Sequence, residues 1–520
     1  MLEEISYRQI LSNDTESIEE RCDAIIRLAA EKLSESLKEV ERNNLGDIPR
    51  EECLRCSDEI AKITYDILLE ELKPIPLNIL KTKIMIELKG TYNQDCKIFI
   101  DEVETEAIEL VRNILNQEIS AGVQVRIMPD THVGKGIVIG FTMPVTRMVN
   151  PNYIGVDIGC SVTTFKLNQR IEEEQFPTLD HAIRRSIPMG MHIRKEKNLD
   201  DWWITPYFET VNNNLHAFQQ KWFQRFGETK DSILVDKEYI TSLCKKIGIK
   251  ESTFYCSMGT LGGGNHFIEL GESAKDGSHY LTIHSGSRHF GLKVCNYHAK
   301  KMHKTTVLPE EYHEEFKCIT RDTLPTSDIP QKLEELNKRY HVGKREYMLE
   351  GEDMYEYLVD MVIAQTYAQF NHKAMAKAIF KDLGENYQAV DTVYSMHNFI
   401  DTTDWIIRKG AIRAYQGEKM VIPFNMRDGL LICEGKSNPD WNCSAPHGAG
   451  RVLARNKALK TLDMEEFTKE MEGIYSTSVC RQTLDESPMA YKDKDLIMQA
   501  IQDTATIIDT IKPIMNIKAL

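Results

Sequence analysis

Apolar residues recur at steps of three and four along the first 80 residues, which is the spacing of one face of an α-helix. One such stripe covers residues 18–40, and a second covers residues 53–67. Pro74 and Pro76 then interrupt the pattern. The pattern predicts a small helical module over residues 1–83, and we expect this module to contact a protein or ribonucleoprotein partner.

Beyond residue 83 the pattern changes to short apolar runs rich in β-branched residues, with longer helical stretches between them. Strand-like runs cover residues 84–92, 96–100, 123–145, 281–284, 391–400 and 419–433. Helical patterns cover residues 104–116, 180–250 and 353–380. Within the third strand-like run we predict a polar loop at Pro129–Gly136. The alternation predicts one large α/β domain (mixed α+β) over residues 84–520, with antiparallel strands lining a cleft and helices outside.

The composition of the chain is that of an ordinary globular protein. Its 520 residues carry a formal net charge of −15, with 28% charged and 42% hydrophobic residues. This acidity opposes promiscuous binding of nucleic acid but permits a local basic groove. No apolar run is long enough to span a bilayer, and the start MLEEISYRQI lacks the features of a signal peptide. We therefore expect the twelve cysteines to be reduced and the protein to be cytoplasmic.

The octapeptide GVDIGCSV at residues 155–162 is a candidate metal site. It places Asp157 and Cys160 three residues apart in a glycine-bearing turn. A hard oxygen and a soft sulfur together suit a borderline first-row metal better than magnesium or calcium. Taken alone, however, the octapeptide is more simply interpreted as a buried turn with a capping aspartate and a small core cysteine.

Three histidine motifs further along the chain favour the metal site. His266 follows three glycines in GTLGGGNHFIEL, His284 ends an apolar run before Ser-Gly-Ser-Arg, and His397 closes another apolar run. Imidazoles at strand ends are typical ligands of such metals. Asn265 and Arg288 accompany the first two histidines and could bind a phosphate group. Each motif alone is weak, but together they indicate a metal centre beside an anion site.

The segment SAPHGAGR at residues 444–451 is a second focus of candidate chemistry. A histidine that attacks phosphorus needs open backbone on one side and a nearby cation to stabilise developing charge. His447, with Gly448, Gly450 and Arg451, meets both requirements. The alternative is a turn whose histidine is only hydrogen-bonded.

Aromatic residues gather at residues 202–226, including Trp202, Trp203, Trp222 and Phe223. Such residues can stack on RNA bases, but they more commonly fill a core. We therefore predict that this cluster packs inside a helical subregion.

In their order along the chain, the motifs MPDTHVGKG, GVDIGC, GGGNHF, HSGSR, HN, HGAGR and DESPMAYKD resemble those of the RtcB-type RNA ligases. The resemblance runs from about residue 85 to the end of the chain. It implies a layered domain in which mainly antiparallel sheets surround a metal cleft. It also implies an enzyme that uses manganese and GTP to join RNA 3′-phosphate or 2′,3′-cyclic phosphate ends to 5′-hydroxyl ends.

The resemblance assigns roles to individual residues. One Mn²⁺ ion would be held by Asp157, Cys160 and His266, and a second by Cys160, His284 and His397. His447 would attack the α-phosphate of GTP and carry GMP. The remaining residues implied to bind nucleotide or RNA phosphate are Asn265, Glu269, Arg288, Asn398, Tyr491 and Lys518, of which Glu269, Tyr491 and Lys518 would form the guanine pocket.

The chain also departs from the family pattern. PFNMRDG at Pro423–Gly429 replaces a PGSMG-like loop, and Asn371-His372 stands where Asn-Arg is expected. His289-Phe290 likewise replaces Gly-Leu. We expect a divergent paralogue that retains guanylylation and acts in RNA repair rather than routine tRNA splicing. Two other functions stay open: a non-ligating RNA-end binder, and a metal-dependent cyclic phosphodiesterase that does not use His447.

Overall fold

The computed structural model of the chain describes residues 85–305, 310–322, 328–339 and 348–520. Residues 85–520 belong to one unit. The helical module predicted over residues 1–83 lies outside the described residues, so that prediction and the proposed partner of the module stay predictions.

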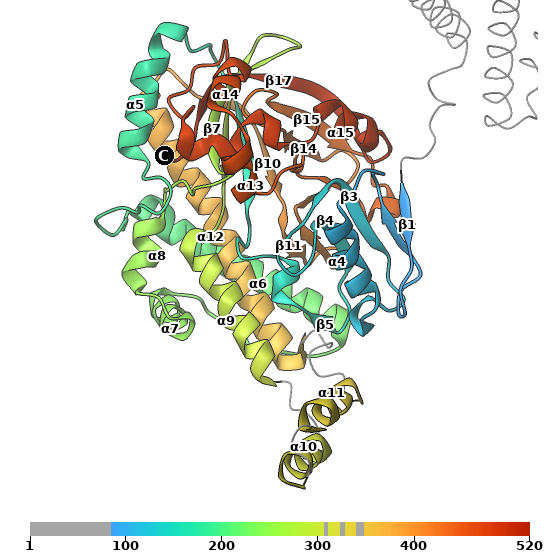
Figure 1. Cartoon of the computed structure of the whole chain (residues 1–520). Coiled ribbons are helices and arrows are strands. Elements are labelled where there is room, and N and C mark those ends of the chain that lie inside the picture. Colours follow the sequence, from blue (N-terminus) through green and yellow to red (C-terminus); the bar gives the residue numbers. More distant parts are fainter. Residues whose placement is uncertain (1–84, 306–309, 323–327, 340–347) are drawn as a thin grey trace, which may run out of the picture. The chain divides into compact units, whose positions relative to one another are not determined.

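A seven-stranded antiparallel sheet forms the larger layer of the domain (Figure 1). Its strands, in spatial order, are β10 (Ala389–Met396), β6 (Ser161–Leu167), β8 (His279–Ser285), β7 (Phe267–Ser273), β17 (Ala505–Ile517), β15 (Leu430–Gly435) and β14 (Lys419–Pro423). The backbone N–H of Val421 in β14 donates to Oγ of Ser395 in β10 over 2.8 Å. Because the two edge strands are joined in this way, the sheet is nearly closed into a barrel.

A second sheet has six strands, of which only β2 and β3 run parallel to each other. Their spatial order is β1 (Ile86–Leu88), β2 (Cys96–Ile98), β3 (Val125–His132), β4 (Ile139–Pro144), β12 (Ile406–Lys409) and β11 (Asn398–Asp401). Two further pairs are β13 (Ala411–Arg413) with β16 (Ser444–Pro446), and β5 (Met148–Val149) with β9 (Leu349–Glu350). The mixed α/β fold with mainly antiparallel sheets, predicted from the sequence, is confirmed.

Strand β3 differs from its prediction, because it continues through His132 where a loop was expected from Pro129. Its pairing with β4 shifts register between Ile127 and His132. Asp130, in this irregular stretch, is fully buried. A polar residue can lie in a buried strand here because its carboxylate has partners in a distant segment, which the local sequence does not reveal.

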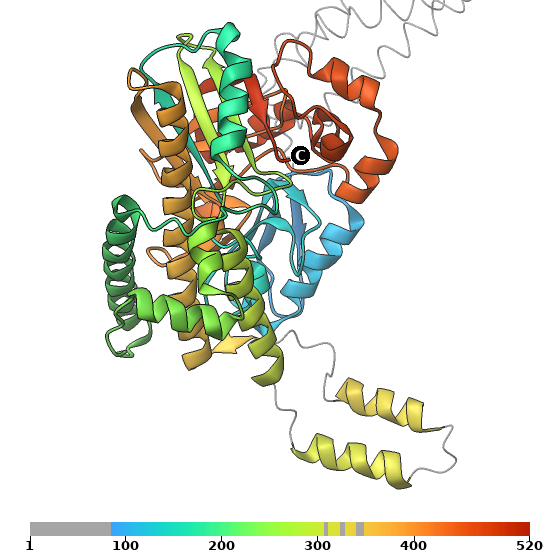
Figure 2. The ribbon, with the colours of Figure 1, turned by 90° about the vertical axis from the view of Figure 1, so that its left-hand side faces the viewer.

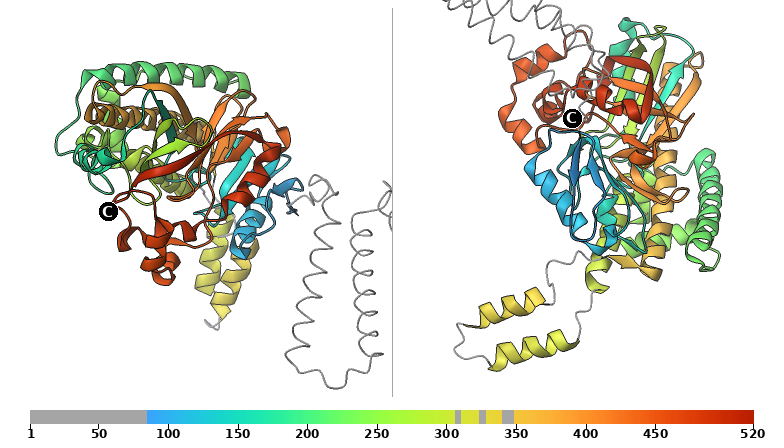
Figure 3. Two further views of the ribbon diagram at one scale, coloured as in Figure 1. Left: turned by 90° about the horizontal axis from the view of Figure 1, so that it is seen from above. Right: turned by 90° about the vertical axis from the view of Figure 1, so that its right-hand side faces the viewer.

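Helix α12 (Gly351–Leu383) is the core element of the helical side of the domain. The sequence pattern predicted an amphipathic helix over residues 353–380, whereas the structure buries residues around the whole circumference of α12. Figure 1 shows α12 between α6 (Asp201–Phe226) and α9 (Arg288–Thr305), and Figure 3 shows α6 along its outer side. Burial on every side follows from this position, because a helix covered all round needs no polar face.

The remaining helices are shorter. They are α4 (Thr105–Leu115), α5 (Phe176–Ser186), α7 (Lys237–Ile247), α8 (Glu251–Ser257), α10 (Glu310–Asp322), α11 (Ile329–Arg339), α13 (Arg455–Thr461), α14 (Met464–Glu470) and α15 (Lys494–Ala500). Figure 2 shows α10 and α11 side by side. Among the helices of the described ranges, none is both long and apolar enough to cross a membrane.

The aromatic cluster of α6 packs into the core. Trp203 and Tyr207 are completely buried, and Trp222 is 2% exposed. Phe223 is an exception, with 54% of its surface exposed. The prediction of core packing is therefore confirmed for most of the cluster.

Candidate active site

Asp157 and Cys160 lie in a tight turn that immediately precedes β6. Gly155 and Gly159 in this turn have φ angles of 97° and 73°, which residues with a Cβ atom rarely adopt. A Cβ atom at Gly159 would lie 2.9 Å from Cα of Gln365 in α12. The turn therefore packs directly on the central helix, and only glycine permits this approach.

The three histidines come from three strands of the seven-stranded sheet: β8 and β10 flank β6, and β7 lies beyond β8. His284 lies in β8, His266 directly precedes β7, and His397 directly follows β10. In the strand register His284 pairs with both Val162 and Phe267. Hydrogen bonding between antiparallel neighbours thus brings segments from distant parts of the sequence to one edge of the sheet.

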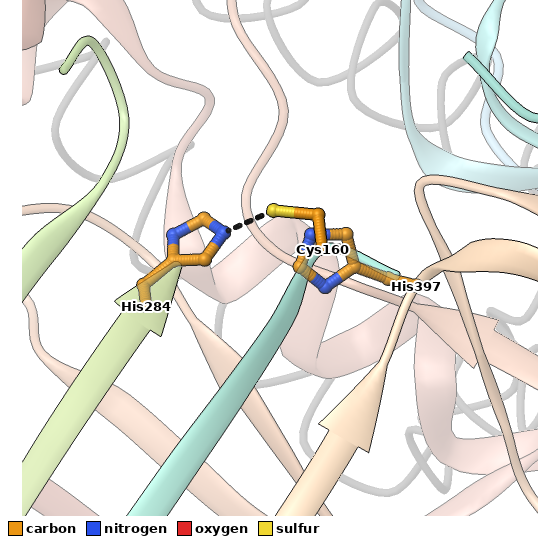
Figure 4. Close-up of side chains that lie close together, drawn as sticks. All are labelled: Cys160, His284 and His397. Atoms are coloured by element: carbon orange, nitrogen blue, oxygen red, sulfur yellow. Dashed lines mark hydrogen bonds between the residues drawn. The ribbon is translucent and has the colours of Figure 1, made fainter. Parts of the chain in front are cut away.

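The five side chains form two groups that share Cys160. Its Sγ atom lies 3.4 Å from Nε2 of His266 and 3.4 Å from Nε2 of His284. Nε2 of His266 lies 3.0 Å from Oδ2 of Asp157. The ligand atoms of Asp157, Cys160 and His266 all lie within 4.8 Å of one another, as do those of Cys160, His284 and His397. Figure 4 shows the second group, with its three side chains gathered at the ends of neighbouring strands.

The electrostatics of these groups suit a bound cation. Burial, followed by the nearby charge of Asp157, raises the pKa of the Cys160 thiol well above its ordinary value. Burial, followed by the charges of neighbouring imidazoles, lowers the pKa of His284 and His397. Neutral imidazoles offer lone pairs to a metal, and a cation would favour the thiolate.

Two buried polar atoms of these groups also support this fit. Oδ1 of Asp157 and Nδ1 of His397 have no hydrogen-bond partner among the described residues. Buried polar atoms normally have partners, so each of these atoms requires an explanation. A carboxylate, a thiol and three imidazoles together are a donor set for borderline first-row metals. The residues of the two groups therefore fit metal ions of this class.

His447 follows β16, and a buried carboxylate orients its ring. Nδ1 of His447 lies 2.6 Å from Oδ2 of Asp130, and the backbone N–H of His447 donates to the same oxygen over 3.1 Å. Because a carboxylate only accepts hydrogen bonds, Nδ1 carries the proton and the lone pair lies on Nε2. This is the protonation state that a nucleophilic imidazole needs.

The structure also joins His447 to the candidate metal centre. The ring centroids of His447 and His397 lie 4.8 Å apart, with the rings inclined at 45°. Backbone N–H groups of Gly410 and Ala411 donate to the carbonyl oxygen of His397, and Ala411 begins the strand that pairs with β16. Backbone hydrogen bonds therefore join the segment of the candidate nucleophile His447 to the segment of His397.

All the predicted site residues except His266 and Arg288 line one cavity of about 650 Å³. Four of the five metal-ligand candidates, all except His266, line the same cavity as Glu269, Tyr491 and Lys518. A volume of this size is in the range that holds a small-molecule ligand. The cavity can therefore bring a nucleotide and the candidate metal centre together.

Lys518 contacts a buried charge network in this cavity. Its Nζ atom donates to Oε2 of Glu486 over 2.9 Å, and the Tyr491 hydroxyl donates to the same oxygen over 2.7 Å. Arg451 and Arg455 also pair with Glu486. Burial would raise the pKa of Glu486, but the surrounding cations, Lys518 first, lower it to about 2. Glu486 therefore stays ionised and holds three cations at the cavity wall.

Glu269 lies on the neighbouring strand β7. Its Oε2 atom accepts a hydrogen bond of 2.7 Å from Nδ2 of Asn516, its neighbour on β17. Burial raises the pKa of Glu269 to about 8. At neutral pH this carboxyl is therefore largely protonated. A ligand that donates hydrogen bonds to it would favour the ionised form.

The side chains of Asn398 and Arg288 bond mainly to backbone or neighbouring side chains. Nδ2 of Asn398 donates to the carbonyl oxygen of Asp157 over 3.3 Å, and its Oδ1 accepts from the backbone N–H of Gly410. Arg288 donates to Oγ1 of Thr260 and to the carbonyl oxygen of Gly190. Asn398 and Asn265 line the cavity, whereas Arg288 does not. Their predicted contacts with phosphate stay predictions.

Helix α12 supports the segments of the candidate metal centre through Asn371 and His372, which are both buried. Oδ1 of Asn371 accepts from the backbone N–H groups of Gly259 and Thr260, and its Nδ2 donates to the carbonyl oxygen of Gly286. Nδ1 of His372 lies 2.8 Å from Oγ1 of Thr163, and its Nε2 lies 3.0 Å from the carbonyl oxygen of Ser285. The pair thus supports the segments next to Cys160, His266 and His284.

The loop Pro423–Gly429 between β14 and β15 forms another wall of the cavity. Oδ1 of Asn425 accepts from the backbone N–H groups of Arg427 and Asp428, which fixes the turn. Asp428 pairs with Arg427, and Arg427 also pairs with Glu470 of α14. The substituted loop is therefore ordered by its own polar side chains.

Sequence reasoning gave no role to Asp130, Glu486 or Asn371. Asp130 lies in MPDTHVGKG and Glu486 in DESPMAYKD, so both are in motifs that were singled out. Membership of these motifs was the signal by which sequence reasoning could have found the two residues. The contact between Asp130 and His447 joins residues 317 positions apart, which no local pattern predicts.

A family model described as tRNA-splicing ligase RtcB matches residues 113–519 of the chain. The RNA-splicing ligase RtcB of Escherichia coli (strain K12) is 28% identical over 455 residues, covering 83% of this chain and 99% of that protein. The tRNA-splicing ligase RtcB of Methanococcus maripaludis is 23% identical over 476 residues, covering 78% and 91%. That of Pyrobaculum aerophilum is 24% identical over 436 residues, covering 72% and 83%. Since the family model matches well over half of the sequence, the chain belongs to the RtcB family.

Proposed function

We propose that this protein is a GTP- and Mn²⁺-dependent RNA ligase that joins RNA 3′-phosphate or 2′,3′-cyclic phosphate ends to 5′-hydroxyl ends. One observation carries the proposal: His447, oriented by Asp130, lines the same cavity as side chains from both groups of candidate metal ligands. The names of the relatives, RNA-splicing and tRNA-splicing ligases, support the choice of RNA as substrate.

In the first step, Nε2 of His447 attacks the α-phosphorus of GTP. A P–N bond forms, the bond to the β-phosphate oxygen breaks, and pyrophosphate leaves. Asp130 keeps the proton on Nδ1 and stabilises the positive charge that the ring acquires. The resulting histidine–GMP phosphoramidate is the activated form of the enzyme.

In the second step, an oxygen of the RNA 3′-phosphate attacks the same phosphorus and His447 leaves. The RNA then ends in a diphosphate linked to guanosine. The 5′-hydroxyl of the second strand attacks the RNA phosphorus, which forms the phosphodiester and releases GMP. An alcohol cannot readily displace oxide from a phosphate monoester, so the phosphate must first gain this leaving group. A cyclic phosphate end must first be opened by water to a 3′-phosphate.

Asp157, Cys160 and His266 would hold one Mn²⁺ ion, and Cys160, His284 and His397 the other. Bound ions would supply neutralisation of phosphate charge in the transition states. The chain's own residues orient the nucleophile and exclude water from the buried edge of the sheet. Glu269, Tyr491 and Lys518 would bind the guanine base, and Asn265 the nucleotide phosphates. Arg288 and Asn398 would face nucleotide or RNA phosphate.

An intact-mass measurement after incubation with GTP and Mn²⁺ tests the proposal. We expect a GMP-sized adduct on the wild-type protein and none on His447→Ala. Arg185→Ala, a change at an exposed position of α5, is a matched control that should still form the adduct. If metal is bound but no adduct forms, the ligase proposal is wrong.

The same variants separate the two alternative functions. RNA-end binding or opening of cyclic phosphate that survives in His447→Ala, without any ligation by the wild type, would identify a binder or a phosphodiesterase. If the protein is a ligase, His447→Ala should leave RNA with either kind of end, 3′-phosphate or 2′,3′-cyclic phosphate, unjoined, with at most a 3′-phosphate formed. We also propose that the protein acts in cytoplasmic RNA repair. Identifying the RNAs that it joins in cells tests this part of the proposal.

A further inference from the structure

The backbone of Lys518 is held by a segment that is distant in the sequence. Strand β17 ends at Ile517, so Lys518 lies beyond the ladder that fixes the preceding residues. The Lys518 side chain is nevertheless 4% exposed and reaches Glu486 across the cavity wall. Lysine has four rotatable side-chain bonds, so its ammonium can occupy one position only where the backbone is itself fixed.

Arg184 of α5 supplies this fixation. Its Nη1 atom donates to the carbonyl oxygen of Lys518 over 3.0 Å, and its Nη2 atom donates to Oγ of Ser478 over 2.8 Å. The Ser478 hydroxyl in turn accepts from the backbone N–H of Lys518 over 2.9 Å. A guanidinium thus holds both backbone groups of Lys518, one directly and one through Ser478.

The guanidinium of Arg184 is itself fixed in place. Nε donates to Oδ1 of Asp180, one helical turn earlier, over 2.8 Å. Oδ2 of Asp180 accepts from the Thr477 hydroxyl over 2.6 Å, and Thr477 also accepts from Nη2 of Arg184. Asp180 is 4% exposed, so this ion pair is well shielded from solvent. Arg184 does not line the cavity and therefore does not touch a ligand there.

We propose that Arg184 is a positioning residue of the nucleotide pocket: it fixes the backbone of Lys518 so that the Lys518 ammonium stays at the cavity wall between Glu486 and Phe267. Nζ of Lys518 lies 5.6 Å from the centre of the Phe267 ring, which also lines the cavity. The inference rests on the proposed binding of GTP in this cavity. It adds that α5, a helix outside the cavity, determines nucleotide affinity.

The contacts predict an effect on binding rather than on chemistry. Loss of the Arg184 guanidinium leaves His447 and the metal-ligand candidates untouched, because its contacts are with Asp180, Met189, Ser478, Thr477 and Lys518. It removes the Arg184 hydrogen bond to the Lys518 carbonyl oxygen and leaves the Ser478 hydroxyl, which Arg184 no longer holds, as the remaining partner of this backbone. Nucleotide binding must then order Lys518 more fully. We therefore expect Arg184→Ala to raise the Kd and KM for GTP about 10-fold and to change the guanylylation rate at saturating GTP less than about twofold.

The experiment measures GTP affinity by calorimetry for Arg184→Ala, Arg184→Lys, Lys518→Ala and the double variant, with Arg185→Ala as the matched control. Arg184→Lys should recover part of the affinity, because an ammonium can still reach the carbonyl oxygen of Lys518. In the Lys518→Ala background, Arg184→Ala should have no further effect, because it acts through Lys518. Unchanged affinity in Arg184→Ala, or an equal loss in the Lys518→Ala background, would overturn the inference.

Hydrogen exchange followed by mass spectrometry gives a readout that does not depend on GTP. In Arg184→Ala the amide of Lys518 should exchange faster than in the wild type and in Arg185→Ala, while β7 keeps its protection. Unchanged exchange at Lys518 would overturn the inference whatever the GTP data show. If Lys518 exchanges faster in Arg184→Ala but the wild-type protein binds no GTP, then the proposed function is wrong and the positioning role of Arg184 is not.

Discussion

Nδ1 of His447 lies 2.6 Å from Oδ2 of Asp130, and Asp130 is completely buried. This pair settles which nitrogen of the candidate nucleophile carries the proton. It also connects the six-stranded sheet with the two-stranded pair of β13 and β16, because Asp130 lies in β3 and His447 follows β16.

Replacing Asp130 by Asn should impair guanylylation strongly. An amide can present its NH₂ group to Nδ1, which would move the imidazole proton to Nε2 and remove the lone pair that attacks phosphorus. By analogy with the loss of a triad carboxylate, we expect a fall of roughly 10³–10⁴-fold in the rate of adduct formation. Intact mass against time, at saturating GTP and Mn²⁺, measures this rate. A rate within tenfold of the wild type would show that Asp130 does not set the tautomer.

Substitution by alanine should lower Mn²⁺ affinity at one of two adjacent glycines and leave it unchanged at the other. A Cβ atom at Gly262 would lie 1.9 Å from Nδ1 of His266, whereas at Gly263 its nearest neighbour would be 3.5 Å away, in Gly190. Gly262→Ala must therefore displace the His266 ring, and we expect Mn²⁺ affinity to fall about 10–100-fold. Gly263→Ala is the matched control and should bind as the wild type does. Electron paramagnetic resonance of free Mn²⁺ measures both; equal affinities would contradict the assignment of His266.

Acid should destabilise the protein partly through His372. Burial lowers the pKa of His372 from 6.5 to about 4. The folded protein therefore binds fewer protons than the unfolded chain below pH 6.5, so stability is present above that pH and is lost as pH falls towards 4. This one group accounts for a loss on the order of 3 kcal/mol.

His372→Gln should reduce this pH dependence. A glutamine amide can still accept from Thr163 and donate to the carbonyl oxygen of Ser285, but it does not titrate. Urea unfolding at intervals from pH 7.5 to pH 4.5 measures the free energy of unfolding of both proteins. Parallel curves for wild type and His372→Gln would show that His372 is not the responsible group.

Glu486→Ala should destabilise the fold as well as the pocket. The substitution leaves Arg451 and Lys518 facing each other without the carboxylate that compensates them, and both are largely shielded from solvent. Breaking a buried ion pair in this way costs about 3–5 kcal/mol. Thermal unfolding measures the loss. Glu434→Ala, at an exposed position of β15, serves as the control and should change stability far less.

The sequence predicted the components of the site better than their arrangement. Asp157, Cys160 and the three histidines stand out because each lies within two residues of a glycine or at the end of an apolar run. Strand pairing then brings them together. The position of β8 was predicted in part, from the apolar run that ends at His284, whereas β6 and β7 were not among the predicted strands.

Contacts between distant segments could not be predicted in the same way. Asp130 was placed in a loop because its neighbours are polar, and only the approach of residue 447 explains why it lies in a buried strand. Arg184 and Lys518 are 334 positions apart, and neither lies in a pattern that indicates the other. Such contacts depend on how whole layers pack, which local periodicity does not encode.

The spread of the metal-ligating residues along the chain has a consequence for the life of the protein in the cell. Asp157 and His397 lie on segments that fold into neighbouring strands only after a very long loop has closed. Ions that bind the assembled groups and not the unfolded chain would shift the folding equilibrium towards the native state. Scarcity of such ions would then lower the amount of intact protein through degradation, in addition to slowing its chemistry.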